Sequence, residues 1–141
     1  MFVTRAFRCD HDDIRELLAT REGWKEKTDL TEGVAFIARQ GPVIGLVRLI
    51  EVAPQTLVVD SVLVHEDHRG KGVGRQLMQA LMNSRGGTLY LCCRPERVEF
   101  YGHLGFSEVE VESCPPDVLA YWEKIGDYPP GDDPVRYLTT R

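Results

Sequence analysis

The chain has 141 residues, 43% of them hydrophobic and 28% charged, with a formal net charge of −5. This length suits one domain with a full hydrophobic core, covering residues 1–141, and the acidic balance argues against a general nucleic-acid-binding protein. Because no apolar run approaches the roughly 20 residues of a membrane span and no signal peptide is evident, we expect a cytoplasmic protein without a membrane partner.

The first half of the chain is expected to form four strands and one clear helix. Asp10 is placed to cap a helix that carries Ile14, Leu17 and Leu18 on one face. The polar stretch 21–31 predicts a short helix or a loop. Gln40-Gly41-Pro42 is typical of a hairpin turn. The expected strands are 2–8, 34–38, 43–52 and 55–64.

The second half alternates helices with strands. An amphipathic helix is expected from about Gly72 to Ser84, because Val73, Leu77, Met78 and Leu81 share one face and Gly86-Gly87 follows. Later helices are expected at 96–104 and 117–125, and strands at 88–93, 106–112 and 135–139. This alternation predicts an α/β fold with a mixed sheet and helices on both faces.

The segment that joins residues 62–64 to the amphipathic helix predicts an anion-binding turn. Glycine has no Cβ, so a phosphate can approach the backbone closely. The first N–H groups of a helix have no internal partner, and the helix dipole favours negative charge there. Positive charge comes from Arg69, Lys71 and Arg75. The turn therefore favours a polyphosphate, although Arg69 and Lys71 are also compatible with solvated surface charges.

The glycine spacing distinguishes between polyphosphates. A Walker loop requires a Ser or Thr after its Lys, and a dinucleotide fingerprint requires Gly-x-Gly-x-x-Gly, whereas this chain has Gly70-x-Gly72-x-Gly74. The pattern that fits is Arg-x-x-Gly-x-Gly, beginning at Arg69. Downstream, Glu99–Phe106 carries an aromatic pair with Tyr, followed four residues later by Gly-Phe.

These two motifs, in this order, resemble the GNAT superfamily of acyl-CoA N-acyltransferases. The resemblance is clearest over 57–109. It implies a mostly antiparallel sheet of six to seven strands with splayed central strands, acetyl-CoA as co-substrate, and transfer of acetyl to a primary amine within a ternary complex. The residues that it assigns to the cofactor are Val62, Leu63 and Val64 for the pantetheine arm, and Arg69, Gly70, Lys71, Gly72, Val73, Gly74 and Arg75 for the pyrophosphate.

The resemblance also suggests catalytic residues. Tyr101 occupies the place of the usual general-acid tyrosine, and a packed aromatic is the alternative. Asp60, four residues before Val64, is the first candidate for the base that takes the amine proton, and Glu51 is the second. For Asp60, a capping or exposed strand residue and a substrate anchor stay open. The chain departs from many members at 94–97, where an Asn is common in the superfamily.

Other features are less informative. The four cysteines are too few for a disulfide scaffold, and neighbouring Cys92 and Cys93 should point to opposite faces of a strand, so no metal site is expected. The resemblance places Trp24 and Trp122 in the regions of the usual acceptor pocket, although tryptophans are more often packing groups than ligand platforms. A non-catalytic acyl-CoA-binding module of the same fold is the alternative function. The amine acceptor, whether small molecule or peptide, and a possible homodimer stay open.

Overall fold

The computed structural model describes residues 1–140, which divide into two compact units. Unit 1 comprises Met1–Ile50 and Asp60–Arg85, and unit 2 comprises Glu51–Val59 and the chain from Gly86 onward. Seven strands are hydrogen-bonded in the order β1-β2-β3-β4-β5-β7-β6. Strands β3 and β4 contribute residues to both units, so the units share two strands but are otherwise built from separate segments.

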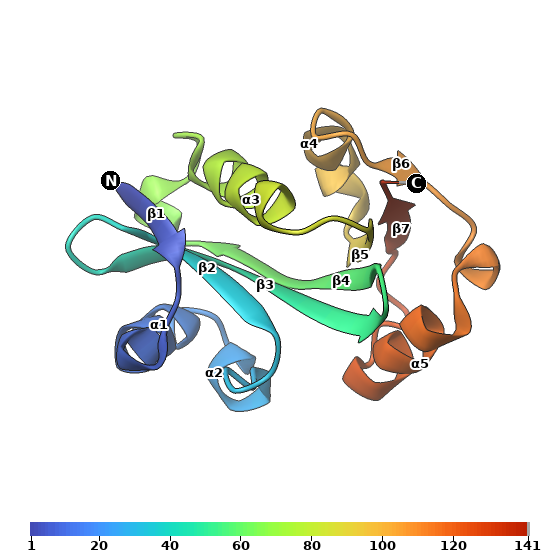
Figure 1. The fold of residues 1–141 in the computed structure, drawn as a ribbon, viewed down its shortest axis with the longest axis horizontal. Coiled ribbons are helices and arrows are strands. Elements are labelled where there is room, and N and C mark those ends of the chain that lie inside the picture. The colour runs from blue at the N-terminus through green and yellow to red at the C-terminus, as the bar shows by residue number, and fades with distance from the viewer. Residues whose placement is uncertain (141) are drawn as a thin grey trace. The chain divides into compact units, whose positions relative to one another are not determined.

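Unit 1 carries its helices on both faces of its strands. Helices α1 and α2 lie on one face of β2 and β3, and α3 lies on the other (Figure 1). Strands β1 to β3 pair antiparallel, and a bulge interrupts the β2–β3 register at Ala38 and Arg39. The elements are β1 (Phe2–Arg5), α1 (His11–Leu18), α2 (Trp24–Lys27), β2 (Val34–Arg39), β3 (Val43–Ala53), β4 (Thr56–Val64) and α3 (Val73–Ser84).

The core of unit 1 joins α1 to the sheet. The three apolar residues that define the face of α1 in the sequence are all buried, as expected from their helical spacing. They pack against apolar side chains of β2, β3 and β4. This cluster consists of Ile14, Leu17, Leu18, Ile37, Val43, Leu46 and Leu63.

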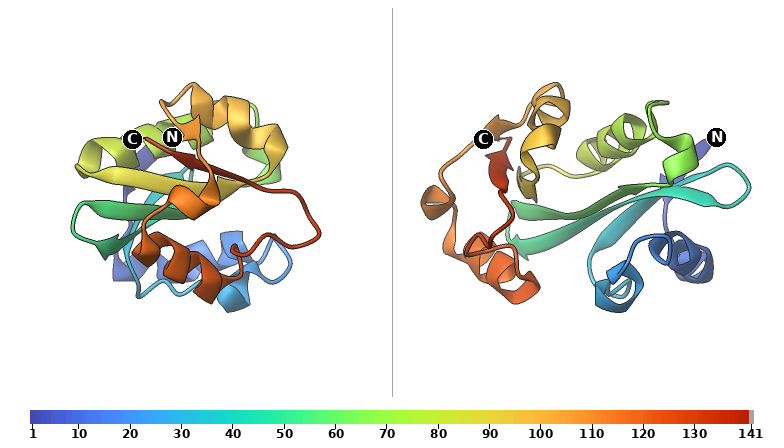
Figure 2. Two further views of the ribbon diagram at one scale, coloured as in Figure 1. Left: turned by 90° about the vertical axis from the view of Figure 1, so that its right-hand side faces the viewer. Right: turned by 180° about the vertical axis from the view of Figure 1, so that it is seen from behind.

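Unit 2 places α4 and α5 on opposite sides of its strands (Figure 2). The start of β4 pairs parallel with β5, over Thr56–Val58 and Thr88–Tyr90. Strand β7 pairs antiparallel with both β5 and β6. The elements are β5 (Thr88–Cys93), α4 (Val98–Gly102), β6 (Ser107–Glu108), α5 (Pro116–Ile125) and β7 (Arg136–Thr139).

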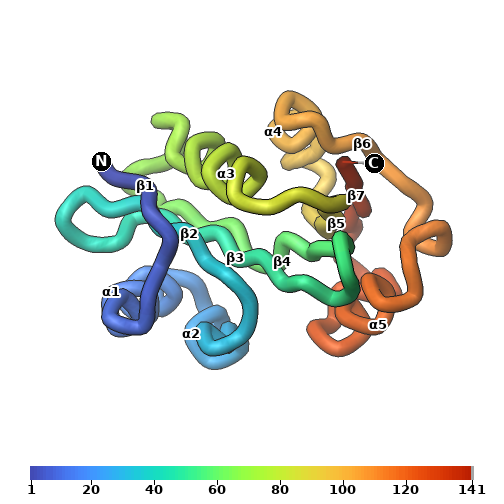
Figure 3. The backbone as a smooth tube through the Cα atoms, in the orientation of Figure 1, coloured from blue at the N-terminus to red at the C-terminus, as the bar shows by residue number. Residues whose placement is uncertain are grey.

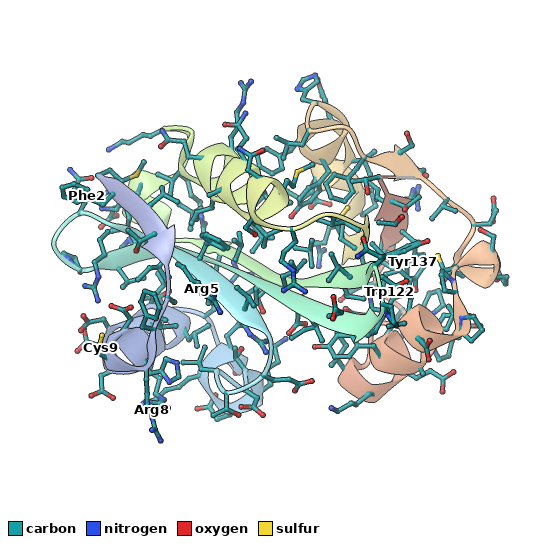
Figure 4. All side chains as sticks on the ribbon, viewed as in Figure 1. Phe2, Arg5, Arg8, Cys9, Trp122 and Tyr137 are labelled. Atoms are coloured by element: carbon teal, nitrogen blue, oxygen red, sulfur yellow. The ribbon has the colours of Figure 1, made fainter. Side chains whose placement is uncertain are left out.

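Aromatic packing anchors α5 to β7. Trp122 is fully buried, and its ring centroid lies 5.0 Å from that of Tyr137 (Figure 4). The Tyr137 hydroxyl donates a hydrogen bond of 2.6 Å to the carbonyl of Asp127. In this structure Trp122 is therefore a packing group of unit 2, one of the two roles that the sequence left open for it.

The fold class predicted from the sequence is confirmed: the sheet is mixed, mostly antiparallel and seven-stranded, with helices on both faces. Two strands are shorter than expected. β1 ends at Arg5 rather than Arg8, because Arg8–Asp10 turns into a 3₁₀ helix. The strand expected over 106–112 is reduced to β6, and Val111–Ser113 forms another 3₁₀ turn. Within residues 1–140, no helix is long and apolar enough to cross a membrane.

Candidate functional site

The turn between β4 and α3 has the backbone conformation that an anion site requires. Figure 3 traces the chain from the end of β4 through this turn into α3. Gly70 and Gly72 have φ values of +76° and +79°, which disfavour any residue with a Cβ. A Cβ built on either glycine would meet no atom within 4 Å, so the space beside the backbone is open to a ligand.

The first amides of α3 are available to that ligand. The N–H of Gln76 is the first to bond in this helix, to the Gly72 carbonyl at 3.1 Å. The preceding N–H groups, those of Gly72, Val73, Gly74 and Arg75, have no acceptor within residues 1–140. Together with the positive end of the helix dipole, these groups form a site for a phosphate.

Three basic side chains surround the turn, and all three are exposed. Arg69 folds back, so that its Nε donates to the Val64 carbonyl at 3.1 Å. Lys71 and Arg75 have no acidic partner among the described residues. His65 supports the turn from within, because its Nδ1 accepts a 3.1 Å hydrogen bond from the N–H of Asp67. Among the described residues, the charges of Lys71 and Arg75 are therefore not engaged in an ion pair.

Gly45 on β3 brings α3 close to the sheet. A Cβ at this position would lie 2.7 Å from Cδ1 of Leu77 and 3.0 Å from Cγ1 of Val73. Both of these side chains are buried on the inner face of α3. The absence of a side chain at Gly45 therefore lets α3, and with it the glycine turn at its start, pack close to β3 within unit 1.

Asp60, the first candidate for the base, forms an ion pair with Arg48. Its Oδ2 accepts a hydrogen bond from Nη1 of Arg48, whose side chain is only 3% exposed, whereas that of Asp60 is 13% exposed. Nη2 of Arg48 donates to the carbonyls of Asp29 and Glu32, at 2.7 and 3.2 Å. Arg48 was not among the site residues expected from the sequence. A single charge inside the apolar run 43–50 was the signal that could have found it, because a buried cation requires partners.

Tyr101 lies in unit 2, on α4. Its side chain is 6% exposed, and its ring contacts those of Phe100 and Phe106 edge-on, with centroids 5.0 and 5.8 Å away. Burial raises the pKa of the hydroxyl above its usual value of about 10. The hydroxyl bonds to no other described residue, yet no buried side-chain oxygen in residues 1–140 lacks a partner, so this oxygen reaches the surface. The Tyr101 hydroxyl is therefore protonated and makes no hydrogen bond within the described residues.

The two cysteines of β5, Cys92 and Cys93, have weakly acidic thiols. Burial raises the pKa of Cys92 to about 12 and that of Cys93 to about 11. Both thiols are therefore protonated at neutral pH and are poor nucleophiles. Within the described part of the chain, no cluster of three or more His, Cys, Asp or Glu side chains could hold a metal ion.

Comparison with known proteins identifies the family. The family model described as an acetyltransferase (GNAT) domain matches residues 31–108, more than half of the chain. The chain belongs to the GNAT acetyltransferases. The match covers both the glycine turn and Tyr101, as the resemblance of the two motifs predicted.

Several solved structures share the fold of this GNAT protein. Rv2747 from Mycobacterium tuberculosis, in complex with CoA, has a TM-score of 0.74 and 17% identity, over 99% of this chain and 98% of that one. An aminoglycoside 6′-N-acetyltransferase complexed with coenzyme A has a TM-score of 0.69 and 19% identity, over 99% and 96%. The ribosomal-protein-S18-alanine N-acetyltransferase from Escherichia coli has a TM-score of 0.70 and 14% identity, over 98% and 91%.

Proposed function

We propose that this GNAT protein transfers the acetyl group of acetyl-CoA to a primary amine, by direct attack within a ternary complex. The observation that carries the proposal is the start of α3, where unpaired amides, two glycines with positive φ and unneutralised basic side chains meet. In this proposal Gly70–Arg75, together with Arg69, bind the pyrophosphate of the cofactor.

The strand that precedes the turn would hold the pantetheine arm. The pairing of β4 with β5 covers Thr56–Val58 and does not extend to Val62–Val64. Backbone groups of Val62, Leu63 and Val64 are therefore proposed to pair with the amides of the arm, in the manner of an added strand. Leu63 buries its side chain in the core at the same time.

The reaction is a balanced acyl transfer. The amine nitrogen attacks the thioester carbonyl, a C–N bond forms, the C–S bond breaks, and free CoA and an N-acetylated amine result. An alkylamine of pKa about 10.4 is mostly protonated at pH 7, so supplying the neutral form costs about 4.6 kcal/mol. Asp60 and Glu51 are the two candidate carboxylates for this step: one of them, directly or through water, would receive the amine proton, and anchoring of the acceptor is the other role open to Asp60. Tyr101 is proposed as the acid that protonates the departing thiolate, because burial keeps its hydroxyl protonated.

The acceptor is proposed to be an amine because two proteins of similar fold are named as N-acetyltransferases, one of a small molecule and one of a protein. One of the solved structures is an aminoglycoside acetyltransferase, and another is an acetyltransferase of a ribosomal-protein alanine. Both proteins are under 20% identical to this chain, so the proposal names the class of acceptor, a primary amine, and not a particular acceptor. A small-molecule amine and a peptide amine are therefore both included in the test.

Calorimetry with CoA tests the cofactor site. We expect the wild-type protein to bind CoA, and Arg75→Gln to weaken the binding about fivefold, which corresponds to about 1 kcal/mol for one charge-assisted contact at an exposed position. Arg8→Gln is the matched control, because Arg8 is also exposed but lies on the 3₁₀ turn that follows β1. No heat of binding at millimolar CoA would remove the proposal.

Release of free thiol from acetyl-CoA then separates an enzyme from a binding module. The amine panel consists of putrescine, kanamycin, a peptide that begins with alanine and a peptide that contains lysine. Amine-dependent thiol release is expected with at least one of them. CoA binding without thiol release from any amine would favour the alternative function, a non-catalytic acyl-CoA-binding module of the same fold.

A further inference from the structure

Arg48 makes an unusual set of contacts for a strand residue of unit 1. Its guanidinium is buried in β3 and donates three hydrogen bonds, one to the Asp60 carboxylate and two to backbone carbonyls. The two carbonyls belong to Asp29 and Glu32, in the segment that joins α2 to β2. One buried side chain thus connects β3, β4 and this segment.

The segment 29–33 is itself a closed turn. The Asp29 carboxylate accepts hydrogen bonds from the N–H and the hydroxyl of Thr31, at 2.9 and 2.6 Å. Gly33, with φ +76°, lies so close to β3 that a Cβ would stand 2.4 Å from the Leu49 carbonyl oxygen. The turn is therefore held at one end by backbone packing and along its length by Arg48.

The position of this network matters if the proposed function is correct. The pyrophosphate would lie at the start of α3, and the arm would run from Val64 toward Val62. At about 3.3 Å per strand residue, Asp60 lies about 13 Å back along β4 from Val64. The acetyl end of the arm would therefore arrive beside Asp60 and the side chain that holds it, which is where an amine must approach.

We propose that Arg48 is a positioning residue for the amine acceptor: it holds the 29–33 turn as one wall of the acceptor site and uses the Asp60 carboxylate as a fixed anchor rather than a proton acceptor. This inference rests on the proposed function. Its physical basis is that the Asp60 carboxylate is the only carboxylate that hydrogen-bonds to the buried Arg48 guanidinium among the described contacts, and a buried cation without its anion is strongly unfavourable. The amine proton then leaves through another group, such as water or Glu51.

Arg48→Lys tests the positioning role. Lysine keeps the charge and can reach Asp60, but it lacks the planar guanidinium group that also donates hydrogen bonds to two backbone carbonyls. We expect KM for the best amine of the panel to rise at least fivefold, while KM for acetyl-CoA and the calorimetric Kd for CoA change less than twofold. Amide hydrogen exchange of 29–33 should accelerate, which reports loosening of the turn independently of activity.

Arg39→Lys is the matched control. Arg39, on β2, also makes three hydrogen bonds, to Asp10, Asp13 and the Gly41 carbonyl, and none of them reaches β4 or the 29–33 turn. Its replacement should leave both KM values within twofold. Thr31→Val is the second variant, in case Arg48→Lys fails to fold: it loosens the turn without exposing a buried charge and should raise only the amine KM, about twofold to threefold.

Asp60→Asn decides between an anchor and a base. Asparagine retains an oxygen that accepts from Arg48 but carries no charge and cannot take up a proton from the amine, so urea denaturation first establishes that the variant is folded under the assay conditions. We expect kcat to fall by less than about tenfold, whereas a fall of a hundredfold or more that is rescued by added imidazole would overturn the inference. Equal changes in both KM values in Arg48→Lys would also overturn it. Absence of CoA binding by the wild-type protein would instead remove the proposed function, and this inference with it.

Discussion

The two units place their key polar groups in opposite surroundings. In unit 1 the Arg48 guanidinium and the Asp60 carboxylate form an ion pair, with backbone carbonyls completing the contacts of the guanidinium. In unit 2 Tyr101 has no charged partner in contact, and burial is the main cause that raises the pKa of its hydroxyl. A paired charge is expensive to disturb, whereas an unengaged hydroxyl can be removed without structural cost. The first arrangement suits positioning and the second suits proton transfer.

Removal of one partner of the ion pair should have the largest effect. Arg48→Met leaves the Asp60 carboxylate without its cation, and we expect the free energy of unfolding to fall by about 3 kcal/mol. Urea denaturation followed by circular dichroism measures this loss. The double variant Arg48→Met/Asp60→Leu should recover much of it, because an apolar pair needs no compensation. A single variant as stable as the wild type would mean that the pair is not buried in solution.

Tyr101→Phe should affect turnover but not stability. The variant removes the proposed acid, so kcat should fall at least tenfold, equivalent to about 1.4 kcal/mol, with CoA affinity within twofold. The free energy of unfolding should change by less than about 0.5 kcal/mol, because the hydroxyl has no partner among residues 1–140. Steady-state kinetics and urea denaturation measure the two quantities. Wild-type turnover would show that the tyrosine only packs.

Alkaline pH should weaken unit 2 by a smaller amount. Burial raises the pKa values of Cys92 and Cys93 to about 12 and about 11 from 9.0, so the unfolded chain loses these protons first. Stability is therefore complete below pH 9 and falls as pH rises toward 12, by about 1 kcal/mol per thiol at pH 10. Urea denaturation from pH 8 to 10.5 measures this slope. Cys93→Ala should flatten it, and Cys9→Ala, at an exposed thiol, should not.

The fold could be predicted largely from periodicity and glycine placement. The helical spacing of Val73, Leu77, Met78 and Leu81 defined α3, and all four are buried. The strand expected over 106–112 was wrong beyond Glu108. Val109 and Val111 alternate with acidic residues, which is the pattern of a half-buried strand, but the chain does not follow this pattern. The Ser113 hydroxyl instead donates to the Glu110 carbonyl at 2.7 Å, and the chain closes into a turn. Local pattern does not reveal such competing side-chain contacts.

The local backbone of the candidate site could be predicted where glycines determine it. Gly70 and Gly72 have positive φ values, as a glycine turn at the start of a helix leads one to expect. Asp10 shows the limit: it occupies the cap position of α1, but its carboxylate accepts from the Phe7 N–H and from Arg39, and these bonds lower its pKa. Arg48 is a similar case, because its partners lie 12 to 19 residues away and depend on how β3, β4 and the 29–33 turn meet.

The shared strands have a consequence for engineering. Strand β3 passes to unit 2 after Ile50, and β4 returns to unit 1 after Val59. A fragment ending at Arg85 would keep the whole glycine turn before α3 but would also carry Leu57 and Val58, whose strand partners Leu89 and Tyr90 would be missing. Such an uncovered apolar edge invites aggregation. Unit 1, with the glycine turn before α3, therefore cannot be transferred to another scaffold as one continuous segment.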